Sequence, residues 1–216
     1  MFGQKKIAKI VAEFLGAALL AMVLYSIVAR TAFPLFTGLA AGTTYGLLII
    51  LLGGVSGVHA NPAVTLGLWT LRKIQTTEAI VYIVAQMLGG LAAWALLKYF
   101  LGRSLTSLAA NQFDWKIMVA EAVGTAVFGF GLAAAHLRDF DNSKLAVTAG
   151  ASLLVGVLVA SMASNAILNP AVAVGIQSWN WHYATGPIIG AIVGMNLYGL
   201  LFAPDILLKQ TKSKRK

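Results

Sequence analysis

The tripeptide Asn-Pro-Ala occurs twice in this chain, as Asn61-Pro62-Ala63 and as Asn169-Pro170-Ala171. The two asparagines are 108 positions apart in a chain of 216 residues, so each half carries one copy. The same offset matches other residues of the two halves, namely Glu13 with Glu121 and Gly16 with Gly124. These matches at a single offset indicate an internal duplication, with repeats at 1–108 and 109–216 inside one integral membrane domain.

Each tripeptide predicts the start of a short helix. Proline suits the first helical turn, because its φ is preset and its missing N–H would have no partner there. An asparagine directly before it is among the best N-cap residues. The resulting helix end carries about half a positive charge and several unpaired N–H groups.

Composition defines the class of protein. Hydrophobic residues make up 59% of the chain and charged residues 11%, and the mean hydropathy is +0.81. Soluble domains are about half apolar and about a quarter charged. The chain is therefore predicted to be a polytopic membrane protein. It has no cysteine, which excludes disulfides, thiolate metal sites and cysteine nucleophiles.

A membrane-spanning helix needs about 20 apolar residues. Two segments that begin at the prolines are shorter, about 15 Å at 1.5 Å per residue, which is half a membrane; they are Pro62–Leu71 and Pro170–Ser178. The predicted fold is all-α, with six transmembrane helices plus two re-entrant half-helices. The six predicted spans are Ile7–Ala29, Leu35–Leu52, Glu78–Leu101, Trp115–Ala135, Leu145–Ala163 and Gly186–Leu207.

The distribution of positive charge predicts the orientation. With six spans and both termini in the cytoplasm, four cations lie outside and twelve lie inside, as the positive-inside rule requires. The twelve are Lys5, Lys6, Lys9, Arg72, Lys73, Arg138, Lys144, Lys209, Lys212, Lys214, Arg215 and Lys216. Because much of this charge lies near the two ends of the chain, it favours anionic lipid and not nucleic acid as the partner. Three spans per repeat place the repeats in opposite orientations, as an inverted repeat.

Two half-helices that enter from opposite faces would meet N-terminus to N-terminus near the middle of the membrane. Irregular backbone at that depth is tolerated only where it is buried in protein or lines water. The two asparagine amides and the two positive helix ends would then face one axis. The sequence thus predicts a pore whose centre repels cations.

This pattern resembles the aquaporin (major intrinsic protein) family, in a divergent prokaryotic-type form. The similarity rests on the two in-phase tripeptides, on Glu13 and Glu121, and on the segments Ser-Gly-Val-His-Ala-Asn-Pro-Ala-Val-Thr at 56–65 and Trp-His-Tyr-Ala-Thr-Gly-Pro-Ile-Ile-Gly at 181–190. The resemblance implies a homotetramer of independently conducting subunits in the cell membrane. It also implies that Asn61 and Asn169 donate hydrogen bonds to permeating molecules.

The resemblance further implies a selectivity filter outside the midplane, at Ala41, Val157, Ala166 and Val172. Family members usually have arginine at the position of Val172 and an aromatic residue at that of Ala41, and strict water channels usually have histidine at that of Val157. The absence of these larger side chains predicts a wide, apolar filter that passes glycerol-sized neutral solutes along with water. Ile167, which stands where glycine is usual, could refill the space.

The polar residues of the predicted spans and loops have more than one interpretation. Glu13 and Glu121 are predicted to support the loops by accepting hydrogen bonds from N–H groups, in preference to relaying protons. His59 is expected to be a fixed hydrogen-bond partner, although a gate at the cytoplasmic mouth is an alternative. No catalytic Ser/His/Asp set is visible, so no enzyme, cofactor or metal is expected. The alternative functions are a poorly conducting structural or adhesive membrane protein and, less favoured, a coupled transporter.

Overall fold

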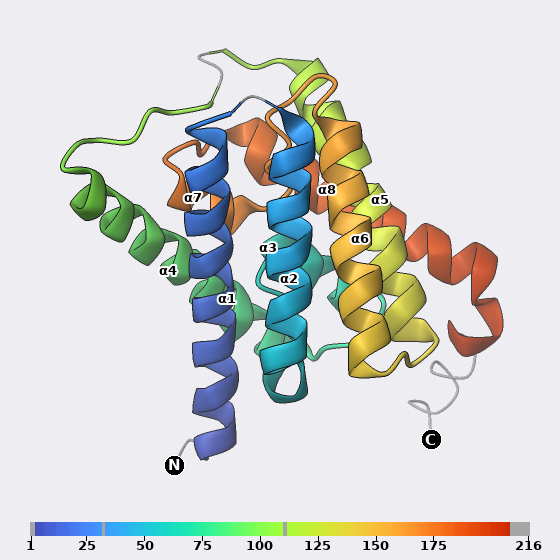
Figure 1. The fold of residues 1–216 in the computed structure, drawn as a ribbon. Helices are drawn as coiled ribbons and strands as arrows, with labels where there is room; N and C mark the ends of the chain where they lie inside the picture. The colour runs from blue at the N-terminus through green and yellow to red at the C-terminus, as the bar shows by residue number, and fades with distance from the viewer. Residues whose placement is uncertain (1–2, 32, 110–111, 208–216) are drawn as a thin grey trace.

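The computed structural model describes residues 3–31, 33–109 and 112–207 (Figure 1). Within these ranges the fold is all-α. The tail cations Lys209, Lys212, Lys214, Arg215 and Lys216 lie outside the described residues. The helices are α1 Gln4–Val28, α2 Pro34–Ser56, α3 Pro62–Thr70, α4 Thr76–Leu101, α5 Trp115–Leu137, α6 Asn142–Ala160, α7 Pro170–Gly175 and α8 Trp181–Phe202.

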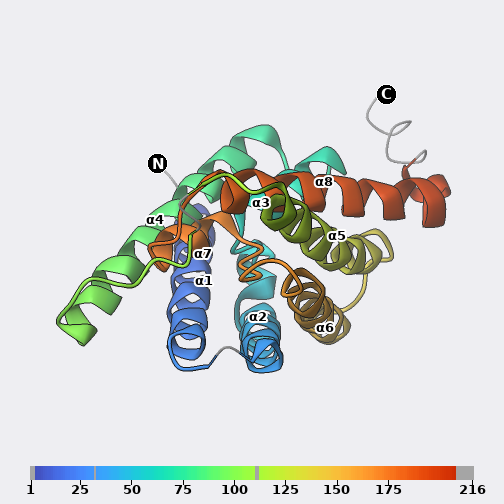
Figure 2. The same ribbon diagram turned by 90° about the horizontal axis from the view of Figure 1, so that it is seen from above.

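Six of these helices are long and apolar enough to cross a membrane: α1, α2, α4, α5, α6 and α8. Their contacts run in a row from α4 through α1, α2, α6 and α5 to α8. The short helices α3 and α7 connect the two ends of this row, since α3 packs on α8 and α4, while α7 packs on α4 and α1 (Figure 2). The predicted fold class, six spans and two half-helices, is confirmed. The division into repeats at 1–108 and 109–216 stays a prediction.

The half-helices are short because each begins at its proline, partway along the bundle, and ends after one to three turns. α3 has nine residues and α7 has six. At 1.5 Å per residue these are about 14 Å and about 9 Å long, too short to span a bilayer. Their N-caps are Asn61 and Asn169, and both are in extended conformation.

Glycines let the long helices approach closely where the two halves meet. A Cβ built on Gly150 of α6 would lie 2.6 Å from the carbonyl oxygen of Gly42 on α2, and a Cβ on Gly42 would clash with Gly150 in the same way. Helices in lipid have no hydrophobic force that drives them together, so close backbone packing through small residues holds such a pair. This contact joins the first and second halves of the chain.

Several predicted boundaries are wrong. α8 begins at Trp181 instead of Gly186, because Asn180 caps it by accepting a hydrogen bond from the Tyr183 N–H at 3.2 Å. Pro187 therefore lies inside the helix and not at its first turn. Asp141 likewise starts α6 three residues early. α2 continues through its Gly-Gly pair to Ser56, α6 stops at Ala160, and α7 stops at Gly175.

Candidate pore

The side chains of Asn61 and Asn169 each make one contact within their own helix and one across the molecule. The Oδ1 atom of Asn61 accepts from the Ala63 N–H at 2.8 Å, and that of Asn169 accepts from the Ala171 N–H at 2.9 Å. The Nδ2 group of Asn61 donates to the Leu168 carbonyl, and that of Asn169 donates to the Ala60 carbonyl, both at 2.9 Å. The caps of the two half-helices are thereby tied to each other's loops.

Glu13 of α1 holds the loop before Asn61 from behind. One carboxylate oxygen accepts from the His59 N–H at 3.0 Å and the Ser56 hydroxyl at 2.7 Å. The other accepts from the Ala60 N–H and the Gln86 side chain, both at 2.7 Å. The side chain of Glu13 is fully buried. All four contacts use the carboxylate as an acceptor, which leaves no loop N–H at this point without a partner.

Glu121 of α5 holds the loop before Asn169 in the same way. Its oxygens accept from the Ile167 N–H at 3.0 Å, from the Leu168 N–H at 2.7 Å and from the Ser164 hydroxyl. This side chain is also fully buried. In both loops, therefore, a buried carboxylate accepts the backbone hydrogen bonds that carbonyl groups would accept in a helix or strand.

The loop backbone is strained at equivalent positions of the two halves. Four non-glycine residues of these two loops have positive φ angles of 48–53°: Val58, Ala60, Ala166 and Leu168. Such conformations cost about 1–3 kcal/mol each and persist only where the surroundings enforce them. The carboxylate hydrogen bonds from one side and the asparagine hydrogen bonds from the other supply that enforcement.

The first loop carries a polar network that has no equivalent in the second. The Gln86 amide donates to Thr65 Oγ1 at 2.9 Å, and Thr65 Oγ1 lies 3.1 Å from Nδ1 of His59. The His59 ring packs edge-on to Tyr82, with centroids 5.2 Å apart. His59 is thus placed among fixed hydrogen-bonding partners. The residues 108 positions later are Ile167, Ala173, Gly190 and Gly194, which cannot form this network.

A small cavity of about 20 Å³ lies between the two asparagines and the long helices. Three of the four predicted filter residues line it, namely Ala41, Val157 and Val172. Its other lining residues are Leu20, Leu24, Tyr45, Asn61, Phe128, Leu153, Ile167 and Asn169. The lining is therefore apolar apart from two amides and one phenol.

The fourth predicted filter residue, Ala166, lies in a different space. It lines a larger pocket of about 360 Å³ at the end of the bundle where α1 stops and α2 starts. Val157 lines both this pocket and the small cavity, so it separates them. This pocket is more polar than the cavity, because its lining includes Thr37, Ser161, Ser164 and Asn165.

The cavity lined by Ala41, Val157 and Val172 is small, and the predicted width of the filter stays a prediction. A space of about 20 Å³ holds roughly one water molecule. Ala41, Val157 and Val172 line this space together with the larger side chains of Leu20, Phe128 and Ile167, which come from other helices and from the second loop. The apolar character of the cavity follows in part from these three residues, whereas its small volume also depends on neighbours that are distant in the sequence.

Sequence reasoning missed Tyr45 and Gln86 as residues of the site. Tyr45 lies on α2 four residues after Ala41, one helical turn away on the same face, and this spacing was the available signal. Gln86 is a fully buried amide in α4. A polar residue in the middle of a predicted span was its only signal.

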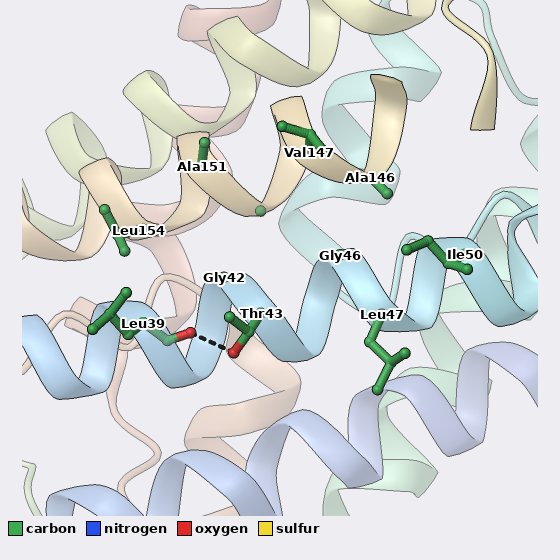
Figure 3. A pocket seen from close by; sticks show the side chains of 11 residues that line it. Leu39, Gly42, Thr43, Gly46, Leu47, Ile50, Ala146, Val147, Ala151 and Leu154 are labelled. Atoms are coloured by element: carbon green, nitrogen blue, oxygen red, sulfur yellow. Dashed lines mark hydrogen bonds between the residues drawn. The ribbon is translucent and has the colours of Figure 1, made fainter. Parts of the chain in front are cut away.

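A second apolar groove, of about 400 Å³, lies between α2 and α6 on the outside of the bundle (Figure 3). Leu39, Leu47, Ile50 and Val147 border it, and Thr43 bonds back to the Leu39 carbonyl at 2.6 Å. Since neither asparagine contributes to it, this groove is part of the outer surface and not of the candidate pore.

Six membrane-spanning helices around two opposed half-helices, with their caps on one internal cavity, define a polytopic channel fold. The family model described as Major intrinsic protein matches residues 3–198. The chain belongs to this family.

Two similar proteins align with most of this chain. Aquaporin Z of Photorhabdus laumondii is 33% identical, over 90% of this chain and 97% of its own. A glycerol uptake facilitator protein-like 6 of Lactiplantibacillus plantarum is 33% identical, over 86% and 94%. The X-ray structure of the aquaglyceroporin from Plasmodium falciparum superposes with a TM-score of 0.76 at 20% identity, covering 94% of this chain and 99% of that one, which supports the fold.

Proposed function

We propose that this protein is a passive channel for water and small neutral solutes of the glycerol type. The observation that carries the proposal is the pair of asparagine amides on one internal cavity. Each Nδ2 group has two N–H bonds, and only one is used to reach the opposite loop. The second is available to the oxygen of a permeating molecule. Among the described residues, no charged side chain lines the cavity.

Ions are expected to be excluded. A dehydrated cation in this cavity would face the positive ends of two half-helices and an apolar wall. The wall offers nothing to replace the ion's hydration shell, and burying an uncompensated charge is very costly. Neutral molecules do not carry this cost, since they need only a few hydrogen bonds along the path.

The apolar lining favours solutes that have a carbon backbone. With Val172 at the position usually held by arginine, carbon atoms can lie against Val157 and Val172 while hydroxyls use the asparagine N–H groups. The cavity is smaller than a three-carbon solute, so side chains that line it must move during the passage of such a solute. We therefore expect glycerol to enter, but more slowly than water.

Stopped-flow light scattering on proteoliposomes tests this proposal through water and glycerol fluxes. Val172→Arg adds bulk and a charge at the constriction and should lower glycerol flux more than water flux. Val172→Leu, the apolar control, should keep the relation between the two fluxes. Water flux without measurable glycerol entry by the wild-type protein would refute the solute part of the proposal.

The alternative function is a structural or adhesive membrane protein that keeps the fold but conducts poorly. The small volume of the cavity is the observation that favours it. The same vesicle measurement separates the two, because a structural protein would give neither water nor glycerol flux above that of empty liposomes.

We also propose that both termini face the cytoplasm and that the protein forms a homotetramer in the cell membrane. The start of α1, the α3–α4 connection and the α5–α6 connection lie on one side, and an ion pair of 3.8 Å between Lys73 and Asp139 joins the latter two. The chain has no cysteine, so single cysteines at Ser104 and Ser143 can report sidedness. An impermeant maleimide applied to intact cells should label Ser104→Cys only. Light scattering in detergent measures the oligomeric state.

A further inference from the structure

The orientation of the loop peptides decides which backbone groups face the pore. The N–H groups of His59 and Ala60 point toward Glu13, behind the loop. In a trans peptide the carbonyl points the opposite way from the N–H of the same unit. The carbonyls of Val58 and His59 must therefore point away from Glu13, toward the inside of the bundle.

The same reasoning applies to the second loop. The N–H groups of Ile167 and Leu168 point toward Glu121, so the carbonyls of Ala166 and Ile167 point inward. Within the described part of the chain, neither of these carbonyls accepts a hydrogen bond. They are acceptors that a permeating molecule can use.

The inward carbonyls of the first loop are already occupied. The hydroxyl of Tyr45 donates to the Val58 carbonyl at 3.0 Å and lies 3.4 Å from the His59 carbonyl. Its ring lines the cavity beside both asparagines and packs edge-on to Phe128 of α5, with centroids 5.4 Å apart. The side chain thus reaches from α2 to the loop while it also contacts the opposite half of the chain.

The second half has no such contact. The residue 108 positions after Tyr45 is Leu153, which also lines the cavity but has no hydroxyl. Two loops of equivalent geometry therefore differ in their acceptors: one offers free carbonyls and the other is covered by a phenol. The covered loop is the one that follows α2, on the side of the membrane where α1 begins.

We propose that Tyr45 forms the inner constriction of the pore and limits the flux of water and solutes past the asparagine pair. This inference rests on the proposed channel function. A molecule that leaves the asparagines toward the side where α1 begins meets the phenol in place of free carbonyls. It passes when the Tyr45 hydroxyl gives up its bonds to the loop or the ring rotates.

The size of the effect follows from the hydrogen bond that must be broken. One net hydrogen bond corresponds to a factor of about 2 to 10 in a rate. Tyr45→Phe keeps the ring and frees the two carbonyls, so water flux should rise within this range and its activation energy should fall. Tyr45→Leu, which copies the residue of the other half, also removes bulk and should raise water and glycerol flux further.

The experiment compares water and glycerol flux per protomer in proteoliposomes for the wild type, Tyr45→Phe and Tyr45→Leu, at several temperatures. Tyr198→Leu is the matched control, since Tyr198 packs on Phe130 and Phe202 away from the cavity. This control should leave flux and activation energy unchanged. Circular dichroism and gel filtration establish that each variant is folded.

The possible outcomes are distinct. Higher flux with a lower activation energy in both Tyr45 variants, but not in the control, supports the constriction. A conducting wild type whose flux and activation energy are unchanged by both variants refutes the role of Tyr45 and leaves the channel function intact. No flux in any of the proteins refutes both, because removing the constriction would then have opened nothing.

Discussion

Replacing Glu13 by glutamine tests how much the buried carboxylates stabilise the loops. The carboxylate accepts four hydrogen bonds, two from backbone N–H groups and two from side chains. Glutamine turns one of its two oxygens into an NH2 donor. The Ser56 hydroxyl can rotate and the Gln86 amide can turn over, but the N–H groups of His59 and Ala60 are fixed by the chain.

In either orientation of the new amide, one backbone N–H is left facing a donor. A buried donor without an acceptor costs about 1–3 kcal/mol. Glu13→Gln should therefore lower the free energy of unfolding by about 1–3 kcal/mol. Glu13→Ala leaves both backbone N–H groups without an acceptor and should cost about 2–6 kcal/mol, roughly twice as much.

Reversible unfolding in mixed detergent micelles, followed by circular dichroism, measures these free energies. Glu78→Gln is the control, because Glu78 pairs with Lys9 at 2.7 Å in a partly exposed salt bridge. Such exposed pairs contribute less than about 1 kcal/mol. If Glu13→Gln cost no more than Glu78→Gln, the argument that these acids satisfy the loop donors would be refuted.

Two further perturbations probe the packing of α2 against α6 and the connection between α4 and α5. Gly150→Val should lower the melting temperature in detergent, because its side chain would overlap the Gly42 carbonyl on α2, whereas Gly54→Ala, with open space around the new Cβ, should not. Equal melting temperatures would contradict the close approach of α2 and α6. Asn165→Ala removes hydrogen bonds of 3.0 Å to the Leu108 carbonyl and to the Tyr183 hydroxyl. Amide exchange in residues 104–109 should then be faster than in the wild type, and unaltered exchange would show that Asn165 does not hold this segment.

The sequence by itself was sufficient for the fold. Apolar segments of about 20 residues have few alternatives in a bilayer, because every backbone donor and acceptor must be satisfied internally. The two Asn-Pro-Ala tripeptides likewise place two helix starts, since the proline and the asparagine cap act locally. The predicted boundaries were wrong where a side-chain cap decides them, as at Asn180, or where a glycine packs on another helix, as Gly53 packs on Asn142.

Tertiary structure determined the interior of the candidate pore. Three of the predicted filter residues, Ala41, Val157 and Val172, give the cavity an apolar lining. Leu20, Phe128 and Ile167, which come from α1, α5 and the second loop, also line it and reduce its volume. Tyr45 reaches carbonyls 13 and 14 residues away in sequence, and the orientation of those carbonyls depends on Glu13 behind them. Local sequence determines which backbone conformation forms at each point of the chain. The free space between the helices depends on side chains that come together only in the folded chain. Because protein interiors are closely packed, a single side chain changes the volume of such a space.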